Sequence, residues 1–371
     1  MALQSRIQKI IMLANGHPVF DTRIFVKEAR SLALAGFQIS LIIPSLRNDL
    51  QDGISIIAVR PTNKGWQKLI VNPWNILRKA FQQPKDAVYH IHDADILIVG
   101  IVLKLFGRKV IYDAHEDTPL QISYQHWLPS ILKKPYAWFY FILEKISGWM
   151  FDKIIVAEPV IARYFPPHKT HLVRNFPIAD SFRLHQPTAY PLRKKRLIHV
   201  GSLSRVRGLF EMLQAASIAA KETDFEFYMG GKFAPPQLEQ EVVSSYPVNF
   251  AGWVSYAGLV DLLFDSRVGI IIPHPIERYK TNYPVKLFEF MAAGLPVIAS
   301  KEGESASFVI EAQCGILVDP LDITEISEAI LWLFNHPVEA EEMGKRGQQL
   351  IFNKYNWERE SNVLLNVYSH F

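Results

Sequence analysis

Residues 281–298 read TNYPVKLFEFMAAGLPVI, and this stretch indicates how the surrounding chain folds. Asn282 is a good helix N-cap, and Pro284 is tolerated in a first helical turn, so we expect a helix that begins at Asn282. Gly294 ends that helix, and an apolar run at residues 296–299 follows as a strand. A helix leading directly into a short apolar strand is the repeating element of an α/β fold.

The same alternation extends from this stretch to both ends of the chain. Short apolar segments, each expected to be a strand, lie at residues 9–13, 37–43, 54–59, 87–91, 109–112, 152–157, 197–200, 225–229, 248–250, 269–272, 296–299 and 315–318. Strands of this kind, separated by helical segments, are typical of parallel sheets covered on both faces. Ligands of such sheets bind beyond the carboxyl ends of the strands.

The strands fall into two α/β halves of similar plan. Residues 181–196 are polar, contain proline and end in the basic cluster 193–196, so we interpret them as a linker. The predicted organisation is an N-terminal domain at residues 1–180, the linker, a C-terminal domain at residues 197–352, and a last helix within residues 353–371 that packs back on the N-terminal domain.

Composition excludes several classes of protein. The 371 residues, 49% of them hydrophobic, are enough for two ordinary domains and rule out a disordered or coiled-coil protein. The formal charge of +4 is too small to indicate nucleic-acid binding. Cys314 is the single cysteine, which excludes a disulfide framework and fits a reducing compartment. Because we find neither a signal peptide nor a membrane-spanning run, we expect a cytoplasmic protein.

Glu289 is the first candidate functional residue. It lies about two turns into the helix that follows the strand at residues 269–272. The start of such a helix attracts phosphate, and a carboxylate in this place can accept hydrogen bonds from a ribose diol. The alternative is an ordinary amphipathic helix with a solvent-facing glutamate, and physical arguments alone favour that alternative.

The match of this stretch to a known family reverses the preference. It resembles the C-terminal signature of the family 4 retaining glycosyltransferases, in which two glutamates separated by seven residues precede a Met-Ala-x-Gly-x-Pro-Val-like run. Glu289 falls on the second acid, which binds the nucleotide ribose in that family. Thr281 stands where the family has the first acid, which contacts the donor sugar, and Asn282 follows it. The resemblance implies the GT-B fold, with two Rossmann-like domains whose parallel sheets face a central cleft.

The loop at residues 200–209 is similar to the family's Gly-Arg-Leu…Lys-Gly loop. Arg207 occupies the position of the lysine that binds the donor diphosphate, and a guanidinium is a sound replacement because it bonds phosphate in pairs. Gly201 allows close approach of a ligand. Ser202 replaces the family's arginine, and Arg205, nearby, is the candidate for supplying the missing charge. The alternative for both arginines is a solvated basic loop.

The N-terminal half carries further matches. Gly16 follows the first strand, where backbone amides can approach a diphosphate, and His17 is next to it. The segments at residues 90–93 and 112–116 also resemble bacterial members of the family. His115 matches the family's active-site histidine, and we place His17 and His92 on the acceptor side. The alternative for His115 is a buried, hydrogen-bonded residue at a strand end, and the alternative for His92 is a residue that only supports the neighbouring loop.

Asp93-Ala94-Asp95 is a literal Asp-x-Asp motif, which holds a divalent cation in metal-dependent transferases of another fold. Three residues are a weak signal. The GT-B resemblance implies instead that Arg207 and helix dipoles neutralise the diphosphate, so we expect no metal and no other cofactor. Activity that EDTA abolishes and Mn²⁺ or Mg²⁺ restores would contradict this.

Tryptophans and basic residues gather in two segments, residues 64–81 and residues 127–151. Basic side chains beside tryptophan fit a helix lying in a membrane interface, and the alternative is that these aromatics belong to the core. We expect peripheral contact with the inner face of the plasma membrane through residues 127–151.

The resemblance implies an enzyme, a retaining hexosyltransferase that moves a sugar from a nucleotide diphosphate to an acceptor hydroxyl. His115, Arg207 and Glu289 are the predicted catalytic residues, and the acceptor is a glycan or a lipid-linked sugar in surface polysaccharide or glycolipid assembly. Two alternatives stay open: a sugar-nucleotide epimerase of the same fold, and a non-catalytic nucleotide-sugar binding protein in which Thr281 and Ser202 mark lost activity.

Overall fold

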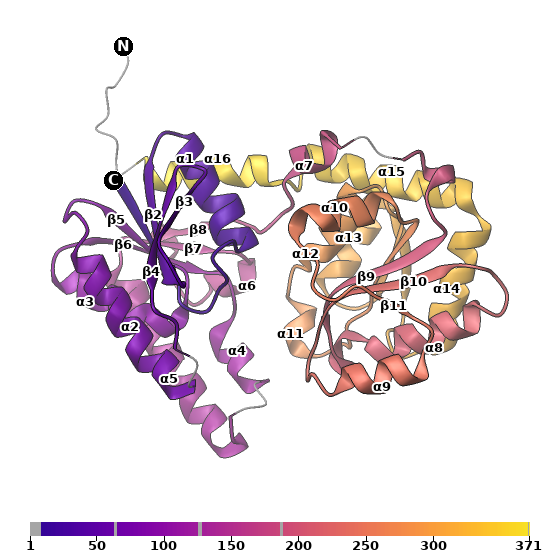
Figure 1. The fold of residues 1–371 in the computed structure, drawn as a ribbon, viewed down its shortest axis with the longest axis horizontal. Helices are drawn as coiled ribbons and strands as arrows, with labels where there is room; N and C mark the ends of the chain where they lie inside the picture. The colour runs from indigo at the N-terminus through magenta and orange to yellow at the C-terminus, as the bar shows by residue number, and fades with distance from the viewer. Residues whose placement is uncertain (1–8, 63–64, 125–127, 186–187, 370) are drawn as a thin grey trace, which may run out of the picture. The chain divides into compact units, whose positions relative to one another are not determined.

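The computed structural model describes residues 9–62, 65–124, 128–185, 188–369 and 371, with the backbone only at residues 65–68 and 257. It divides the chain into two compact units (Figure 1). Unit 1 is Met1–Asn175 with Arg359–Phe371, and unit 2 is Phe176–Glu358. Each unit is an α/β layer structure built on one sheet, so the predicted fold class is confirmed.

Unit 1 contains an eight-stranded sheet of order β3-β4-β2-β1-β5-β6-β7-β8. All neighbours are parallel except the pair β3 and β4. The strands are β1 (Lys9–Leu13), β2 (Gln38–Pro44), β3 (Asp49–Gln51), β4 (Ile54–Val59), β5 (Val88–Ile91), β6 (Lys109–Ala114), β7 (Lys153–Val156) and β8 (Thr170–Leu172). The helices are η1 (Thr22–Ala29), α1 (Arg30–Leu34), α2 (Gly65–Phe81), η2 (Ala94–Ile96), α3 (Leu97–Leu105), α4 (Thr118–Ser123), α5 (Ser130–Met150), α6 (Pro159–Ala162), η3 (Pro167–Lys169) and α16 (Trp357–Tyr368), the last of which begins in unit 2.

The two faces of this sheet are buried by different helices. Figure 1 shows α2, α3 and α5 on one side of the sheet, with α1 and α16 on the other. Successive strand side chains alternate between faces. Tyr89 and Ile91 of β5 therefore join the core formed with α2, α3 and α5, whereas His90 points the other way and its Nδ1 lies 2.6 Å from the hydroxyl of Tyr368 in α16.

Unit 2 contains a six-stranded, entirely parallel sheet of order β11-β10-β9-β12-β13-β14. Its strands are β9 (Arg196–Leu203), β10 (Glu226–Phe233), β11 (Asn249–Phe250), β12 (Val268–Ile271), β13 (Val297–Ser300) and β14 (Gly315–Val318). Its helices are α7 (Ala179–Arg183), η4 (Tyr190–Leu192), η5 (Arg205–Arg207), α8 (Leu209–Ala219), α9 (Leu238–Ser245), α10 (Tyr256–Phe264), α11 (Glu277–Lys280), α12 (Val285–Ala292), α13 (Glu304–Ala312), α14 (Ile323–Asn335) and α15 (Pro337–Asn353). Apart from the two-residue edge strand β11, almost all residues of these strands are buried or half-buried, as expected for a sheet covered on both faces.

The boundary between the units differs from the predicted one. It falls at Asn175–Phe176 instead of residue 180, and the expected linker at residues 181–196 belongs to unit 2. Its Tyr190 is buried, and its hydroxyl donates to the carbonyl of Arg267. Arg193 is also buried and donates to the carbonyl of Ala293. A polar, proline-containing segment resembles a linker in composition, but its few large side chains are enough to dock it. Residues 359–371 pack with unit 1.

Gly231 occupies a position that tolerates no side chain. It pairs with Gly201 across β9 and β10, its φ is 145°, and a Cβ there would stand 1.7 Å from the carbonyl oxygen of Gly201. We expect Gly231→Ala to destabilise unit 2 by roughly 2–3 kcal/mol, measured by urea unfolding. Gly252→Ala is the control, because Gly252 also has a positive φ but open space around its Cβ. Equal losses for the two variants would contradict the steric explanation.

Candidate active site

A pocket of about 830 Å³ opens in unit 1 beyond the carboxyl ends of β1, β5 and β6. It brings together four residues that the sequence singled out: Gly16, His17, His92 and His115. The other lining residues are Leu69, Asp93, Ala94, Asp95, Tyr112, Asp113, Glu116, Thr118, Gln121, Ile122, Tyr136 and Tyr140. Carboxylates and tyrosines among apolar walls suit a ligand that carries many hydroxyl groups.

His17 is held as a cation at the edge of this pocket. Its Nδ1 lies 3.3 Å from Asp21 and its Nε2 lies 3.0 Å from Asp93. Burial alone would lower the pKa of His17, but the two carboxylates outweigh it and raise that pKa to about 10. The imidazole therefore carries its proton at neutral pH. A protonated imidazole donates hydrogen bonds and does not act as a general base. The place of His17 on the acceptor side stays a prediction.

The charge on His17 makes a testable contribution to stability. Burial opposes the shift, but bonds to His17 hold the pKa of both Asp21 and Asp93 at about 2. The stabilisation is therefore complete between about pH 4 and 6.5 and is lost as pH rises through about 10 or falls through about 2. We expect His17→Gln to lower the free energy of unfolding by a few kcal/mol at acidic to neutral pH, and urea unfolding at several pH values measures this. A deficit that stays constant up to pH 10 would contradict the assignment.

The Asp-x-Asp motif is engaged within the protein. Asp93 accepts hydrogen bonds from the backbone N–H groups of Asn15 and Gly16, in addition to its contact with His17. Asp95 accepts a hydrogen bond from the side chain of Asn15. These two carboxylates thus fix the loop after β1, which is a structural reason for the motif that does not involve a metal.

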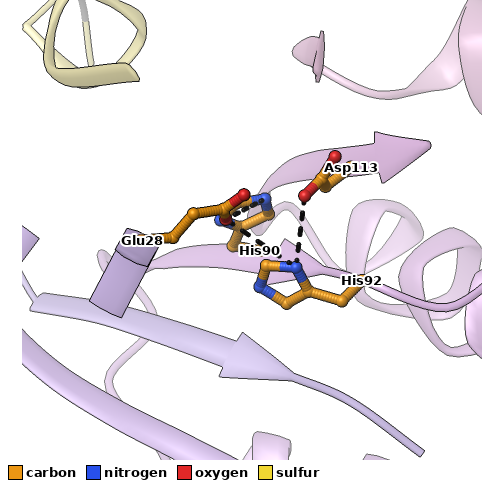
Figure 2. A group of neighbouring side chains, drawn as sticks. All are labelled: Glu28, His90, His92 and Asp113. Atoms are coloured by element: carbon orange, nitrogen blue, oxygen red, sulfur yellow. Dashed lines mark ion pairs between the residues drawn. The ribbon is translucent and has the colours of Figure 1, made fainter. Parts of the chain in front are cut away.

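A buried polar cluster supports the pocket from behind (Figure 2). The cluster contains Glu28 of η1, His90 of β5, His92, and Asp113 of β6. One side-chain nitrogen or oxygen of each residue lies within 4.8 Å of those of the other three, and all four residues are completely or almost completely buried. The nearest pair shown in Figure 2 is Nδ1 of His92 and the carboxylate of Asp113, 3.4 Å apart. The same residue types bind metals, so the charges in the cluster decide what it is.

Arg23 already supplies the positive charge of this cluster. Its Nε and Nη2 donate to the two oxygens of Asp113 at 2.8 and 2.9 Å, and its Nε lies 3.0 Å from Glu28. Burial and the charge of Asp113 raise the pKa of Glu28 well above its usual value. Burial also lowers the pKa of His90 and His92. The guanidinium of Arg23 therefore compensates the carboxylate of Asp113 within the cluster.

His115 borders this network from the pocket side. Its ring packs edge-on against that of His17, with 5.2 Å between centroids, and its Nδ1 lies 3.9 Å from the carboxylate of Asp113. The side chain is 15% exposed, so it can reach a ligand in the pocket. Sequence reasoning identified His115 but not its supports Arg23, Glu28 and Asp113.

In unit 2, the loop after β9 holds Arg207 at the carboxyl end of the sheet. Gly208 follows with a φ of 78°, and a Cβ there would stand 2.3 Å from the carbonyl oxygen of Ile272, so only glycine fits. The backbone N–H of His274 donates to the carbonyl of Val206 and ties this loop to the chain after β12. Arg207 also lies over the ring of Tyr279, 5.4 Å from its centroid.

Gly201 lies between two polar groups. A Cβ at this position would lie 3.9 Å from Nη1 of Arg207 and 3.8 Å from Nε2 of His199. Ser202 is the next residue, one before the end of β9, and it is half-buried. Arg205 is turned to the surface, where it forms an ion pair with Glu241 at 2.8 Å and stacks on Phe210.

Glu289 is buried, with 1% exposure, so it does not face solvent as an ordinary amphipathic helix would place it. Its Oε2 lies 2.7 Å from Nζ of Lys286, three residues before it in α12. The prediction that this helix begins at Asn282 was wrong, because α12 begins at Val285 and Pro284 precedes it as the cap. A residue before proline avoids helical geometry, so the preceding turn cannot form.

Thr281 and Asn282 consequently lie in the connection between α11 and α12. Thr281 is the cap residue at the end of α11, and both residues are half-buried. Neither provides a side-chain cap to α12. Their place in donor binding stays a prediction.

His199 is a functional candidate that sequence reasoning missed. It lies on β9, is 2% exposed, and its Nδ1 is 2.9 Å from the carbonyl of Ile270 in the neighbouring strand. Burial, with smaller effects of Arg207 and Lys286, lowers the pKa of His199 to about 4. The neutral ring therefore donates from Nδ1, and its buried Nε2 has no hydrogen-bond partner among the described residues. A histidine within an apolar strand is the signal that could have drawn attention to it.

Comparison with known proteins agrees with this geometry. Residues 194–336, most of unit 2, match the family described as glycosyl transferases group 1. The chain is 22% identical over 293 residues to the MMP alpha-(1->4)-mannosyltransferase of Mycolicibacterium hassiacum, an alignment covering 75% of this chain and 69% of that protein. It is 27% identical over 156 residues to the D-rhamnosyltransferase WbpZ of Pseudomonas aeruginosa, covering 41% of this chain and 39% of that protein.

Solved structures extend the likeness to almost the whole chain. The sucrose-phosphate synthase of Thermosynechococcus elongatus superposes with a TM-score of 0.72 at 20% identity, covering 98% of both chains. Anabaena Alr3699/HepE in complex with UDP and glucose superposes with a TM-score of 0.73 at 12% identity, covering 98% of this chain and 100% of that one. The fold is GT-B, and the match at residues 194–336 together with these relatives supports a glycosyltransferase of this fold with a nucleotide-sugar donor.

Proposed function

We propose that this protein is a family 4 glycosyltransferase that transfers a hexose from a nucleoside diphosphate to an acceptor hydroxyl with retention of configuration. One observation carries the proposal. The paired strands β9 and β12 end in loops that are bonded to each other, and these loops lead to Arg207 and Glu289. An arginine and a buried glutamate that follow neighbouring strands of a parallel sheet are suited to a diphosphate and a ribose.

The reaction breaks the bond between the anomeric carbon and a diphosphate oxygen. Positive charge develops on the sugar ring and negative charge on the leaving diphosphate, so a fixed cation at the diphosphate lowers the barrier. Arg207 has that role in the proposal. The resemblance to family 4 implies attack from the same face, with the leaving phosphate taking the acceptor's proton. This fits the protonated state of His17, which leaves it unable to take that proton.

The acceptor site in this proposal is the pocket of unit 1. Its polar lining contains the carboxylates of Asp93 and Glu116 and the ring of His115, groups that bond sugar hydroxyls. We place a glycan or lipid-linked sugar here, in surface polysaccharide or glycolipid assembly. The reaction needs no divalent metal, so EDTA leaves the rate unchanged. Loss of activity that Mn²⁺ restores would refute this part.

The decisive experiment begins with thermal shifts against UDP, GDP, ADP and their sugars, because a ligand that binds the native state raises the melting temperature. The best donor is then incubated with candidate acceptors, and NMR of the product gives its anomeric configuration. Transfer with retention supports the proposal. An altered free sugar would indicate an epimerase. Binding without turnover would indicate a non-catalytic protein, and a product of inverted configuration would exclude retention.

We also propose that unit 1 contacts the anionic cytoplasmic leaflet through α5. Ile131, Trp138 and Trp149 are 84%, 67% and 79% exposed, and their spacing puts them near one line along the helix, together with the exposed Lys134 and Lys145. Exposed tryptophans beside lysines fit an anionic interface. Trp127, part of the predicted segment, lies outside the described residues. None of the described helices is long and apolar enough to span a membrane.

Flotation with vesicles tests this contact. We expect the protein to float with vesicles containing anionic lipid at low salt and to stay behind with neutral vesicles. A variant with Trp138→Ser and Trp149→Ser should lose flotation, whereas Trp253→Ser, an equally exposed tryptophan of unit 2, should keep it. Failure of the wild-type protein to float with anionic vesicles would refute the proposal.

A further inference from the structure

The donor site lacks one positive charge at Ser202, and Arg205 is not placed to supply it. Both nitrogen–oxygen contacts of Arg205 with Glu241 are short, at 2.8 and 3.1 Å, and the guanidinium also lies 4.2 Å from the ring centroid of Phe210. This arrangement holds Arg205 against α8 and α9 at the surface. Moving it toward a ligand would break both contacts, so another cation is needed if a diphosphate binds beside Arg207.

Lys286 is such a cation, and it comes from a different segment. It is the second residue of α12, is 31% exposed, and places its Nζ 2.7 Å from Glu289. A lysine ammonium has three N–H donors, so its contact with one carboxylate leaves others for a ligand. The electrostatic influence of Lys286 and Arg207 converges on the same residue, His199. Arg207 follows β9, and Lys286 lies at the start of the helix that leads from the carboxyl end of the paired strand β12 back to β13. Both cations therefore lie at the carboxyl edge of this sheet, where a backbone hydrogen bond joins the loops after β9 and β12.

His199 is an independent sign that a ligand occupies this region. Its Nε2 is buried and has no hydrogen-bond partner in the described part of the chain, which is costly for a polar atom. A Cβ at Gly201 would contact both this Nε2, at 3.8 Å, and Nη1 of Arg207, at 3.9 Å, so the two side chains border the same glycine. Because the neutral ring donates from Nδ1 to Ile270, its Nε2 can accept a hydrogen bond from a ligand hydroxyl.

We propose that Lys286 is a donor-binding residue whose ammonium contacts the diphosphate of the nucleotide sugar, replacing the charge that is absent at Ser202, while Nε2 of His199 accepts a hydrogen bond from a donor hydroxyl. This rests on the proposed function. Lys286 then links the two parts of the donor, because the carboxylate of Glu289 that it holds is the group proposed to bind the ribose. The missing arginine does not mark lost activity in this interpretation.

The test separates binding of phosphate from binding of ribose. The affinities of UDP, GDP and ADP are compared with those of the corresponding nucleosides by calorimetry, in the wild-type protein and in Lys286→Met. We expect the variant to bind the preferred diphosphate roughly ten- to a hundredfold more weakly, as for loss of a charged hydrogen bond, and to bind the nucleoside within about twofold of wild type. A purely structural effect through Glu289 would weaken both ligands alike and would overturn the proposal.

Two further variants sharpen the result. Adding Ser202→Arg to Lys286→Met restores the family's cation, so it should recover most of the lost affinity for the diphosphate. Lys345→Met is the matched control, because Lys345 pairs with Glu342 at the same three-residue spacing on α15 and should change neither affinity. A phosphate-dependent loss in Arg205→Met but not in Lys286→Met would assign the role to Arg205. If the wild type binds none of the three diphosphates, both this inference and the proposed function fail.

Discussion

Replacing Arg23 with methionine should destabilise unit 1 by about 3–5 kcal/mol, because the change leaves a buried carboxylate without its counter-charge. Arg23 is 4% exposed and bonds both oxygens of Asp113, which is completely buried. Methionine fills much of the same volume but cannot compensate the charge. Urea unfolding at neutral pH, with hydrogen exchange of β1, β5 and β6 as a local readout, measures the effect.

The pH dependence of this loss has a defined sign. Burial alone would raise the pKa of Asp113, but Arg23 and His92 together hold it well below its usual value. Its contribution in the wild type is present above the unfolded value near 4 and is lost only as pH falls through the lower folded value. Without Arg23 the carboxyl can protonate, so the deficit should shrink toward pH 4.

Arg30→Met provides the control for this prediction. Arg30 begins α1, and its ion pair with Asp52 is solvent-exposed, so its loss should cost less than about 1 kcal/mol. Similar costs for the two arginines, or a deficit of Arg23→Met that grows toward acid, would show that the buried charge balance has been misread.

The fold was predictable because its strands are short apolar runs, and most lie within one or two residues of their expected bounds. Two strands were missed. β3 is three exposed residues that pair antiparallel with β4, and β8 is three half-buried residues at the opposite edge. Edge strands of this length bury too little apolar surface to leave a pattern. Their existence depends on a neighbour that the local sequence does not show.

The domain boundary was predicted too far along the chain for a similar reason. Phe176 lies just after the Asn175 at which the pattern breaks, and its ring packs against Phe288 and Tyr355 of unit 2. Composition marks where regular structure stops, but it cannot say which core a single aromatic side chain joins. The linker prediction at residues 181–196 failed on the same point, since Tyr190 is buried in unit 2.

The site shows where sequence reasoning ends. The contact of Lys286 with Glu289 spans three residues within one helix and follows from helical geometry. The pair of Arg23 and Asp113 spans 90 residues and depends on the order of strands in the sheet. Motifs singled out His115 and Arg207, but side chains that they contact, such as His17 and Tyr279, come from distant segments that no local pattern connects.

Arg207→Met should lower the transfer rate, as kcat/KM for the nucleotide sugar, on the order of a hundredfold or more, without unfolding the protein. Removing one fixed group that stabilises developing charge has an effect of this size. Arg207 is half-buried, and it lies above the ring of Tyr279 and next to Gly201. Because the described contacts of its side chain are few, its removal should move the melting temperature little.

Arg207→Lys distinguishes charge from geometry in this prediction. A lysine keeps the charge but not the paired donors of the guanidinium, so it should recover part of the rate and not all of it. Arg346→Met is the control, since the guanidinium of Arg346 donates to the carbonyl of Gln313 at the surface, away from β9, and its loss should leave kcat/KM unchanged. Equal rates for Arg207→Met and wild type would show that the diphosphate does not bind at this end of β9. Because Glu289 lies in α12, which follows the neighbouring strand β12, and is assigned by the same argument, its assignment to the ribose would then lose its structural support as well.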